Sequence, residues 1–184
     1  MFEKSSTAAD IIDGFRELNI VPVVISYEYE PCDTFKAREL CLTERDGVYV
    51  KAKDEDFNSM RAGILQKKGN VHISICNPLN MSLDKVKRGA NNNETLTNIA
   101  QLIDNEIYQG YRLWRTNYIA ADLMRNEERY THQYTDGQFY DFQNYLREKS
   151  CSADAEFEPM YEHLLRIYAT PVIKKEQILA GKDE

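Results

Sequence analysis

Three carboxylates stand close together near the start of the chain. Glu28, Glu30 and Asp33 follow an apolar run in the stretch NIVPVVISYEYEPCD, which covers residues 19–33. If the run is a strand, Glu28 and Glu30 point to the same face, because side chains alternate along a strand. Paired carboxylates can bind a metal ion or share a proton, which makes a metal-dependent hydrolase one hypothesis. The solvated end of a strand is the structural alternative, and we favour it.

The three histidines lack the acid partner that a general base needs. His72 lies in a predicted strand with no acid beside it. His132 precedes Asp136, but that acid is better placed at the start of the next predicted helix. His163 stands beside Glu162 in a predicted helix. We expect structural or surface roles for all three.

Motifs for the common catalytic classes are absent. The sequence has no G-x-S-x-G, no P-loop, no G-x-G-x-x-G and no H-E-x-x-H. Its four cysteines form neither a C-x-x-C pair nor a zinc spacing, so reduced thiols are expected. We expect no metal and no cofactor. The cysteines are Cys32, Cys41, Cys76 and Cys151.

A cluster of basic and aromatic residues offers a second kind of chemistry. Arg112, Trp114 and Arg115 combine an indole with two guanidinium groups, close to Tyr118. Trp and Tyr favour the headgroup layer of a membrane, and Arg binds phosphate. The cluster is therefore a candidate for a membrane or phosphate contact. Packing of the aromatic rings in the core is the structural alternative, and we favour it.

Composition limits the partners of the chain. Its 184 residues are 42% hydrophobic and 29% charged, which is typical of a globular domain. The net charge of −7 argues against nucleic acid, because a duplex binder needs a basic surface. No apolar run approaches the roughly 20 residues that span a bilayer. We expect a cytoplasmic protein, with any membrane contact peripheral and at the inner face.

Helix and strand patterns alternate along the first part of the chain. Residues 6–18 predict an amphipathic helix capped at Ser5, Ser6 or Thr7. Residues 20–26 predict a strand with β-branched residues on both faces, which is typical of a parallel strand covered on both sides. A charged segment at 44–56 predicts a loop. A helix at 57–67 and a strand at 69–76 follow.

The second part of the chain predicts helices only. The clearest one has apolar residues from 96 to 107 and ends at Gly110, where a left-handed cap is easiest. A further helix follows Trp114, and Thr135 with Gln138 forms a capping box for the next. The last helix covers about 158–168 and is expected to end before Pro171. The helix-to-strand order predicts an α/β fold, although two strands are few for a sheet.

Several segments in order carry a resemblance to a known family. The residues IVPVV at 20–24, the continuation SYEYEPCDTFKARE, the later KKGNVHISICNPL and the helix LTNIAQLIDNEIYQGYRLWRTNYIAADL are similar to the glycerol-3-phosphate and lysophosphatidate acyltransferases of Bacteroides-type organisms. The similarity covers about residues 10–124 and concerns the carboxyl-terminal half of that family. It implies the transfer of a fatty acyl group from acyl-CoA or acyl carrier protein to a lysophospholipid or glycerol-phosphate hydroxyl, in phospholipid biosynthesis.

The resemblance also implies what this chain lacks. The family uses a His-x4-Asp dyad before the Val-Pro strand, but here the fifth residue after each histidine is Asn77, Gly137 or Tyr168. No Glu-Gly-Thr segment is present. The implied partner is the amino-terminal half of the acyltransferase, and the chain alone is expected to be inactive. If it were active, His72 would be the first residue to mutate.

The resemblance implies a partial acyltransferase-like sheet flanked by helices in residues 1–110, with a helical extension packed on it in residues 111–184. On this basis the expected substrate-cleft residues are Val21, Pro22, Val23 and Ser26. A non-catalytic binding or regulatory module that reuses the half-fold is the alternative. An exposed apolar face or a bare strand edge at 20–26 would favour association with another chain.

Overall fold

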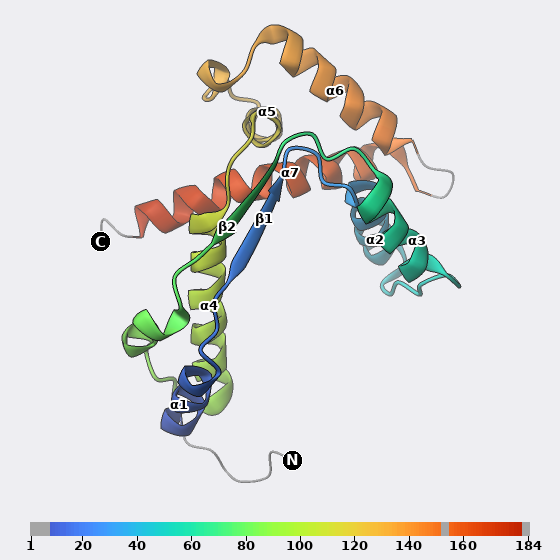
Figure 1. Cartoon of the computed structure of the whole chain (residues 1–184). Helices are drawn as coiled ribbons and strands as arrows, with labels where there is room; N and C mark the ends of the chain where they lie inside the picture. The colour runs from blue at the N-terminus through green and yellow to red at the C-terminus, as the bar shows by residue number, and fades with distance from the viewer. Residues whose placement is uncertain (1–7, 152–154, 182–184) are drawn as a thin grey trace. The chain divides into compact units, whose positions relative to one another are not determined.

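The computed structural model describes residues 8–151 and 155–181 of the chain, and this part is mainly helical (Figure 1). Its strands are β1 (Val23–Tyr27) and β2 (Val71–Ile75). Its α-helices are α1 (Ala8–Leu18), α2 (Asp33–Asp46), α3 (Glu55–Leu65), α4 (Asn92–Gly110), α5 (Arg115–Arg125), α6 (Asp136–Ser150) and α7 (Phe157–Ala180). Short 3-10 helices lie at Leu79–Met81, Leu83–Lys85 and Thr131–Gln133.

The predicted α/β fold with a partial acyltransferase-like sheet is wrong. The described residues contain a single sheet of two antiparallel strands, β1 and β2. The amide of Cys76 donates to the carbonyl of Pro22, and the amide of Glu28 donates to the carbonyl of Asn70, both at 2.9 Å. The β-branched residues on both faces of β1 therefore did not show that other elements pack on both faces. The pattern gives the type of each side chain, but not which segments pack against the strand.

The chain divides into two compact units. In the described part, unit 1 consists of residues 8–25 and 73–112, and unit 2 consists of residues 26–72 and 113–181. The division falls within both strands, so each unit holds a share of the ribbon that they form. The boundary expected after residue 110 concerned parts of a larger protein and stays a prediction.

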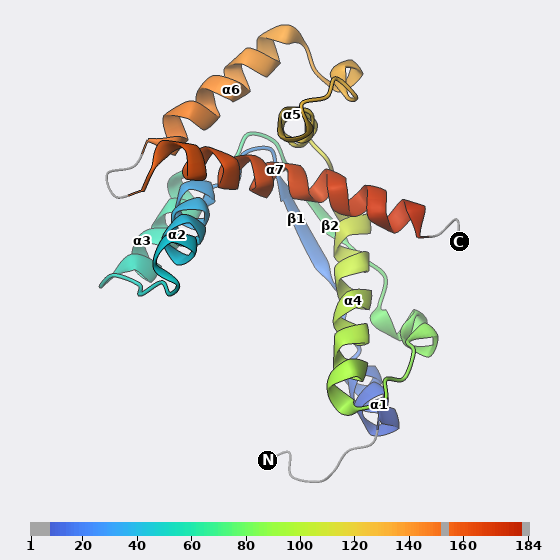
Figure 2. The same cartoon turned by 180° about the vertical axis from the view of Figure 1, so that it is seen from behind.

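Unit 1 is built around the contact of α1 with α4, and Figure 2 shows α1 beside the first turns of α4. Ile12 on α1 is buried with Ile99 on α4 and with Leu79 and Leu83 from the 3-10 helices. The helical spacing in 6–18 therefore predicts the packing of Ile11, Ile12 and Phe15 correctly, whereas Leu18, expected on the same face, is 69% exposed. The predicted capping residues of this helix lie outside the described residues.

Gly110 ends α4, but not as a left-handed cap. The described glycines with positive φ are Gly47 and Gly69, so the predicted conformation of Gly110 is wrong. A Cβ on Gly110 would lie 2.7 Å from the Sγ atom of Cys76 and 3.4 Å from a methyl group of Val24. A glycine is needed here because α4 lies very close to the strands.

Unit 2 packs α5 between α6 and α7, an arrangement that Figures 1 and 2 both show. α2 also packs against α7. The largest fully buried side chains of this core are Phe142, Leu146, Met160 and Leu164. The predicted capping box of α6 is confirmed, since Thr135 accepts from the amide of Gln138 and Gln138 accepts from the amide of Thr135.

Two helices of unit 2 differ from the prediction. α2 was not predicted, because its sequence DTFKARELCLTERD is strongly polar and buries few apolar residues. α7 does not end before Pro171 but continues to Ala180. Proline removes one backbone hydrogen bond from a helix interior. Pro171 and Val172 are buried, so packing of the helix compensates for the lost bond.

Candidate functional site

One face of the ribbon in unit 1 is apolar and exposed to solvent. Val23 and Ile25 on β1 are 58% and 45% exposed, and Ile73 and Ile75 on β2 are 60% and 76% exposed. Val21, just before β1, is 40% exposed and continues the same alternation. We call these five residues the ribbon face. A soluble domain normally covers such a group of β-branched side chains, so an exposed one indicates an interaction surface.

The register of the strands makes the ribbon face continuous. The hydrogen bond between Cys76 and Pro22 places Val23 opposite Ile75 and Ile25 opposite Ile73. These are non-hydrogen-bonded pairs, whose side chains lie closest across an antiparallel ladder. The four side chains therefore form one unbroken apolar strip.

The other face of the same strands is covered. Val24 is 4% exposed, and its methyl group and the side chains of Ser74 and Cys76 lie against Gly110 of α4. The thiol of Cys76 donates to the carbonyl of Glu106 at 3.6 Å. Burial, with a smaller effect from Glu106, raises the pKa of the Cys76 thiol, so this cysteine stays protonated and unreactive.

The ribbon also has open edges. Because the sheet has two strands, each strand pairs on one side only within the described part of the chain. The backbone groups of Val23, Ile25, Ile73 and Ile75 point away from the partner strand in this register. Such an edge is a template on which another strand can pair.

The predicted substrate-cleft residues lie on both faces of β1 and just before it. Val21 and Val23 belong to the ribbon face, whereas Pro22 is buried on the opposite side. Ser26, which belongs to unit 2, is fully buried, and its carbonyl accepts from Nε1 of Trp114 at 3.2 Å. A role of these residues in a substrate cleft stays a prediction.

The carboxylate of Glu28 is buried in unit 2 with its own partners. It accepts from Nε of Arg115 at 2.5 Å, from Nδ2 of Asn70 at 2.8 Å and from the Asn70 amide at 3.0 Å. Burial alone would raise the pKa of the Glu28 carboxyl, but the hydrogen bonds from Arg115 and Asn70 outweigh it and lower this pKa. Glu28 is therefore an ionised structural residue.

Asp33 is held by two tyrosines in the same unit. Its carboxylate accepts from the hydroxyls of Tyr145 at 2.6 Å and Tyr168 at 2.8 Å. The Tyr168 hydroxyl accepts in turn from the amide of Glu30 at 2.9 Å. Burial, and then the charge of Asp33, raise the pKa of both tyrosines well above the ordinary value. They remain neutral donors to Asp33.

The three carboxylates therefore do not act together. The Glu30 side chain contacts Lys36 and the amide of Cys32, each at 3.2 Å, and not the other acids. Within the described residues, no group of three or more His, Cys, Asp or Glu side chains could hold a metal ion. The arrangement gives no support to the metal-dependent hydrolase.

The basic and aromatic cluster separates in the structure. Arg112 belongs to unit 1 and is exposed. Trp114 and Arg115 belong to unit 2, where they bind Ser26 and Glu28. These two side chains therefore have structural partners, and their proposed contact with a membrane or a phosphate stays a prediction.

The histidines lie in three separate elements. His72 is half-buried in β2, and His132 is exposed in a 3-10 helix. His163 on α7 is buried, and its Nε2 lies 3.1 Å from a carboxylate oxygen of Glu44 on α2. This pair joins two helices of the core, which agrees with the expected structural role of His163.

A surface hollow of about 580 Å³ in unit 2 has acidic and aromatic walls. Asp122 in this hollow is buried and accepts from the Tyr134 hydroxyl at 2.7 Å and from the amide of Tyr130 at 2.9 Å. The carboxylate is thus already occupied by its own chain.

No protein-family model, no curated protein and no solved structure matches this chain. In the part of the chain that the structure describes, no helix has the length and apolar character to cross a membrane. The ribbon face is the feature that sequence analysis expected to find covered. The small number of predicted strands was the indication in the sequence that one strand face could be left exposed.

Proposed function

We propose that the chain is a polypeptide-binding module, which uses the ribbon face to dock against another polypeptide. The observation that supports this proposal is the exposed apolar strip of Val23, Ile25, Ile73 and Ile75 on an ordered pair of strands. The described residues offer the strip no cover from within unit 1. The proposal corresponds to the non-catalytic alternative expected from the sequence.

The physical gain on docking comes from the apolar area removed from water, about 25 cal/mol for each Å². β-branched side chains suit this role because their χ1 angles are already restricted, so little side-chain entropy is lost on docking. The open strand edges add hydrogen bonds if the partner contributes a strand. The face carries no charged side chain, so the net charge of −7 does not repel a partner at the contact.

Selection of random peptides on the purified chain tests this proposal. We expect the enriched peptides to alternate apolar and polar residues, which is the pattern of a strand with one buried face. They should bind the wild type at least about tenfold more tightly than the variant Val23→Lys/Ile73→Lys. Leu179→Lys is the matched control, because Leu179 on α7 is also 63% exposed but lies in unit 2.

The proposal fails if no such peptide is enriched, or if the double variant binds as tightly as the Leu179→Lys control. Sedimentation velocity on the same samples shows whether a second copy of the chain occupies the face. Association that increases with concentration and is lost in Val23→Lys/Ile73→Lys would identify the second copy as a partner.

We propose as a second candidate that the chain contributes to an acyltransferase without its own general base. The sequence resemblance supports it, and the residues that carry the resemblance include β1, the strand whose face lacks cover. The polypeptide on the ribbon face would then be the one with the His-x4-Asp dyad. Its substrates would be acyl-CoA or acyl carrier protein and a lysophospholipid.

An assay of the chain alone tests the second candidate. Supplied with an acyl thioester and lysophosphatidate, it should transfer no acyl group above a heat-denatured control. Transfer by the chain alone would contradict the absence of a general base. Addition of a selected peptide that binds the ribbon face should not produce acyl transfer, because the peptide carries no His-x4-Asp dyad.

A further inference from the structure

Helix α3 of unit 2 packs with its small residues and exposes its large ones. Phe57, Met60, Ile64 and Leu65 are between 64% and 75% exposed. Ala62 is the buried residue of this helix. In an ordinary surface helix the large apolar side chains face the core. The amphipathic pattern of α3 is thus inverted relative to its own unit.

The inner side of α3 explains how this inversion is held. The Sγ atom of Cys32, just before α2, lies 3.5 Å from the carbonyl of Ser59 and 3.6 Å from the position of a Cβ on Gly63. Ser59, Ala62 and Gly63 share one side at helical spacing. These small residues bring α3 close to Cys32, which directly precedes α2, and Figures 1 and 2 both show the two helices side by side.

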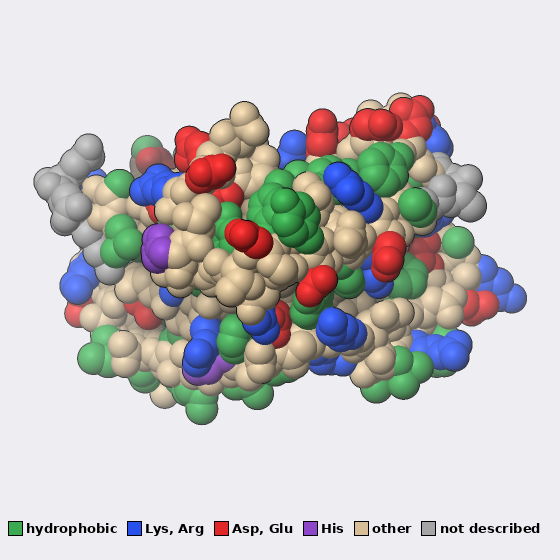
Figure 3. All heavy atoms as spheres, turned by 90° about the horizontal axis from the view of Figure 1, so that it is seen from above, with side chains coloured by type: hydrophobic (Ala, Val, Ile, Leu, Met, Phe, Trp, Pro, Cys, Tyr) green, Lys and Arg blue, Asp and Glu red, His purple; other side chains and the backbone are tan. Residues whose placement is uncertain are grey.

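The outer side of α3 combines apolar and basic residues. Phe57, Met60 and Ile64 follow the i, i+3, i+7 spacing of one helical face, with Arg61 beside them. Lys53 precedes the helix, and Lys67 and Lys68 follow it. Figure 3 shows one face of the molecule, on which hydrophobic, basic and acidic side chains are all exposed.

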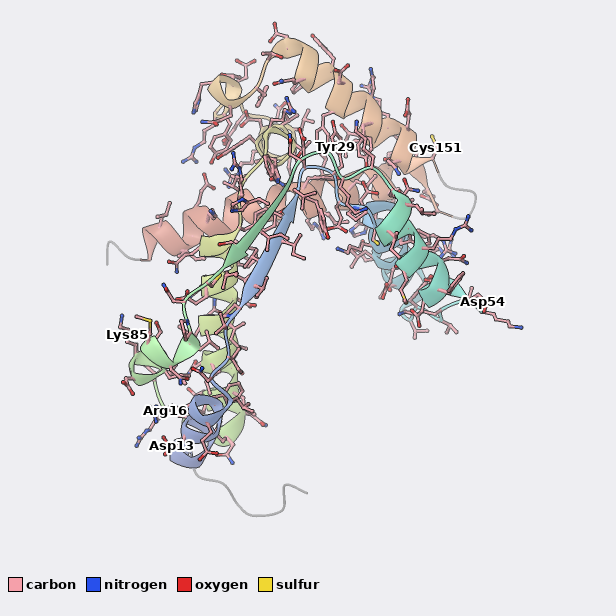
Figure 4. All side chains as sticks on the ribbon, viewed as in Figure 1. Asp13, Arg16, Tyr29, Asp54, Lys85 and Cys151 are labelled. Carbon is pink, nitrogen blue, oxygen red and sulfur yellow. The ribbon has the colours of Figure 1, made fainter. Side chains whose placement is uncertain are left out.

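The charge of this segment is opposite in sign to that of the chain. Residues 47–68 contain five basic and three acidic residues, in a chain of net charge −7. Two of the acids have partners within the segment: Asp56 pairs with Lys51 at 2.7 Å, and Glu55 accepts from the amide of Ala52 at 2.9 Å. The third, Asp54, lies at the outer end of α3 (Figure 4).

We propose that the outer face of α3 docks on an anionic lipid surface. Phe57, Met60 and Ile64 would enter the boundary between headgroups and acyl chains, while the exposed side chains of Arg61 and Lys53 reach lipid phosphates. Nζ of Lys67 lies 4.2 Å from the centre of the Tyr29 ring, and Nζ of Lys68 donates to the carbonyls of Ile64 and Gln66, so these two lysines add positive charge near the face. An apolar helical face bordered by basic side chains is the pattern of helices that lie in a membrane interface. Local positive charge in an acidic chain favours anionic lipid over an acidic protein surface of similar size, because lipid phosphates are dense and mobile.

This site differs from the membrane contact that the sequence predicted. Trp114 and Arg115 bind groups of their own unit, whereas Phe57, Met60 and Ile64 have their large side chains in solvent. The proposal is also independent of the ribbon face, which lies in the other unit. Either proposal can fail without the other.

Sedimentation of the whole chain with vesicles tests the inference. One set of vesicles contains phosphatidylcholine alone, and the other contains phosphatidylcholine with phosphatidylglycerol. We expect binding to the anionic vesicles only, and weaker binding at 0.5 M than at about 0.1 M salt, since salt screens the charge contribution. Ile64→Gln should lower the partition coefficient about tenfold, because one apolar side chain no longer enters the lipid.

Leu18→Gln is the matched control. Leu18 is 69% exposed and Ile64 is 75% exposed, so each substitution removes an exposed side chain of the same size, in different units and outside the ribbon face. The control should bind the vesicles like the wild type. Far-ultraviolet circular dichroism checks that the helices of both variants are retained, and Arg61→Gln tests the charge contribution alone.

Three results would overturn the proposal. The first is no binding to anionic vesicles, or equal binding to both vesicle types. The second is an equal loss of binding in Ile64→Gln and Leu18→Gln, which would indicate general adsorption of apolar surface. The third is reversible self-association that Ile64→Gln abolishes in the absence of lipid, which would assign the α3 face to a second copy of the chain.

Discussion

The two halves of the stretch NIVPVVISYEYEPCD differ in side-chain type and in burial. In its first half, which belongs to unit 1, Val23 and Ile25 are apolar and lie in solvent. In its second half, which belongs to unit 2, Glu28 and Asp33 are acidic and are 3% and 1% exposed. Apolar side chains are usually inside and carboxylates outside, so both halves reverse the common pattern.

The difference lies in the partners that this chain provides. The buried carboxylates are satisfied by Arg115, Tyr145 and Tyr168 from its own helices. The ribbon face has no corresponding cover in the described part of unit 1. The acidic half is thus complete within the chain, whereas the apolar half is exposed, and we propose that a docked polypeptide covers it. The comparison separates structural residues from binding residues.

The largest effect is expected from Asp33→Ala in the complete half. The substitution removes the carboxylate that accepts from the hydroxyls of Tyr145 and Tyr168, and each hydrogen bond to a charged group is worth about 1.5 to 3 kcal/mol. We expect the free energy of unfolding to fall by about 3 to 4 kcal/mol, measured by urea denaturation. Tyr145→Phe is the milder control, at about 1 kcal/mol. Equal stability of Asp33→Ala and the wild type would show that the hydrogen bonds from Tyr145 and Tyr168 to Asp33 do not stabilise the acidic half.

Arg115→Ala is expected to have the next largest effect, and one that depends on pH. The guanidinium is 39% exposed, so we expect a loss of about 2 to 3 kcal/mol at pH 7, below that of a fully buried pair. The folded pKa of Glu28 is lowered, so its stabilising effect is complete above the unfolded pKa of about 4.3 and is lost as the pH falls through the folded pKa.

The difference between the wild type and Arg115→Ala should therefore shrink on acidification from about pH 6 to about pH 3. Denaturant titrations at several pH values measure it, with Arg61→Ala as the control for loss of an exposed arginine. A difference that stays constant with pH would mean that Glu28 does not depend on the guanidinium.

Two neighbouring valines compare the faces of β1 directly. Val24→Ala removes two methyl groups from a buried side chain and should cost about 2 kcal/mol. Val23→Ala removes the same atoms from a side chain that is 58% exposed and should change stability by less than about 0.5 kcal/mol. Thermal unfolding of the two variants measures this difference. Equal losses would mean that the ribbon face is covered in the isolated chain.

A loss smaller than that of Val24→Ala is expected at Gly110, on the covered face of the strands. Gly110→Ala improves helix propensity by about 1 kcal/mol, but the new Cβ meets the Sγ atom of Cys76 at 2.7 Å. We expect a net loss of about 1 kcal/mol, because overpacking costs more than the propensity gain. Cys76→Ala in the same chain should restore most of the loss. If Gly110→Ala alone is stabilising, α4 does not lie as close to β2 as described.

Local patterns in the sequence predict helices and strands, but not which segments pack against them. The capping box of Thr135 and Gln138 and the apolar spacing of α1 are local, and the structure confirms both. α2 and the passage of α7 through Pro171 depend on packing between distant segments, which a local pattern does not contain. The exposure of Val23 and Ile25 likewise depends on whether another segment packs on their face. The sequence of β1 does not contain that information.

Amide hydrogen exchange along residues 21–33, with and without a peptide selected on the ribbon face, tests the central claim most directly. We predict that the outward amides of Val23 and Ile25 exchange fast in the free chain and slow at least about tenfold on binding, while the amides of Glu28 and Asp33, already bonded within the chain, do not change. Slow exchange of Val23 and Ile25 in the free chain would contradict the claim. Protection that appears only at Glu28 to Asp33 would also contradict it, because the binding half would then be the acidic one.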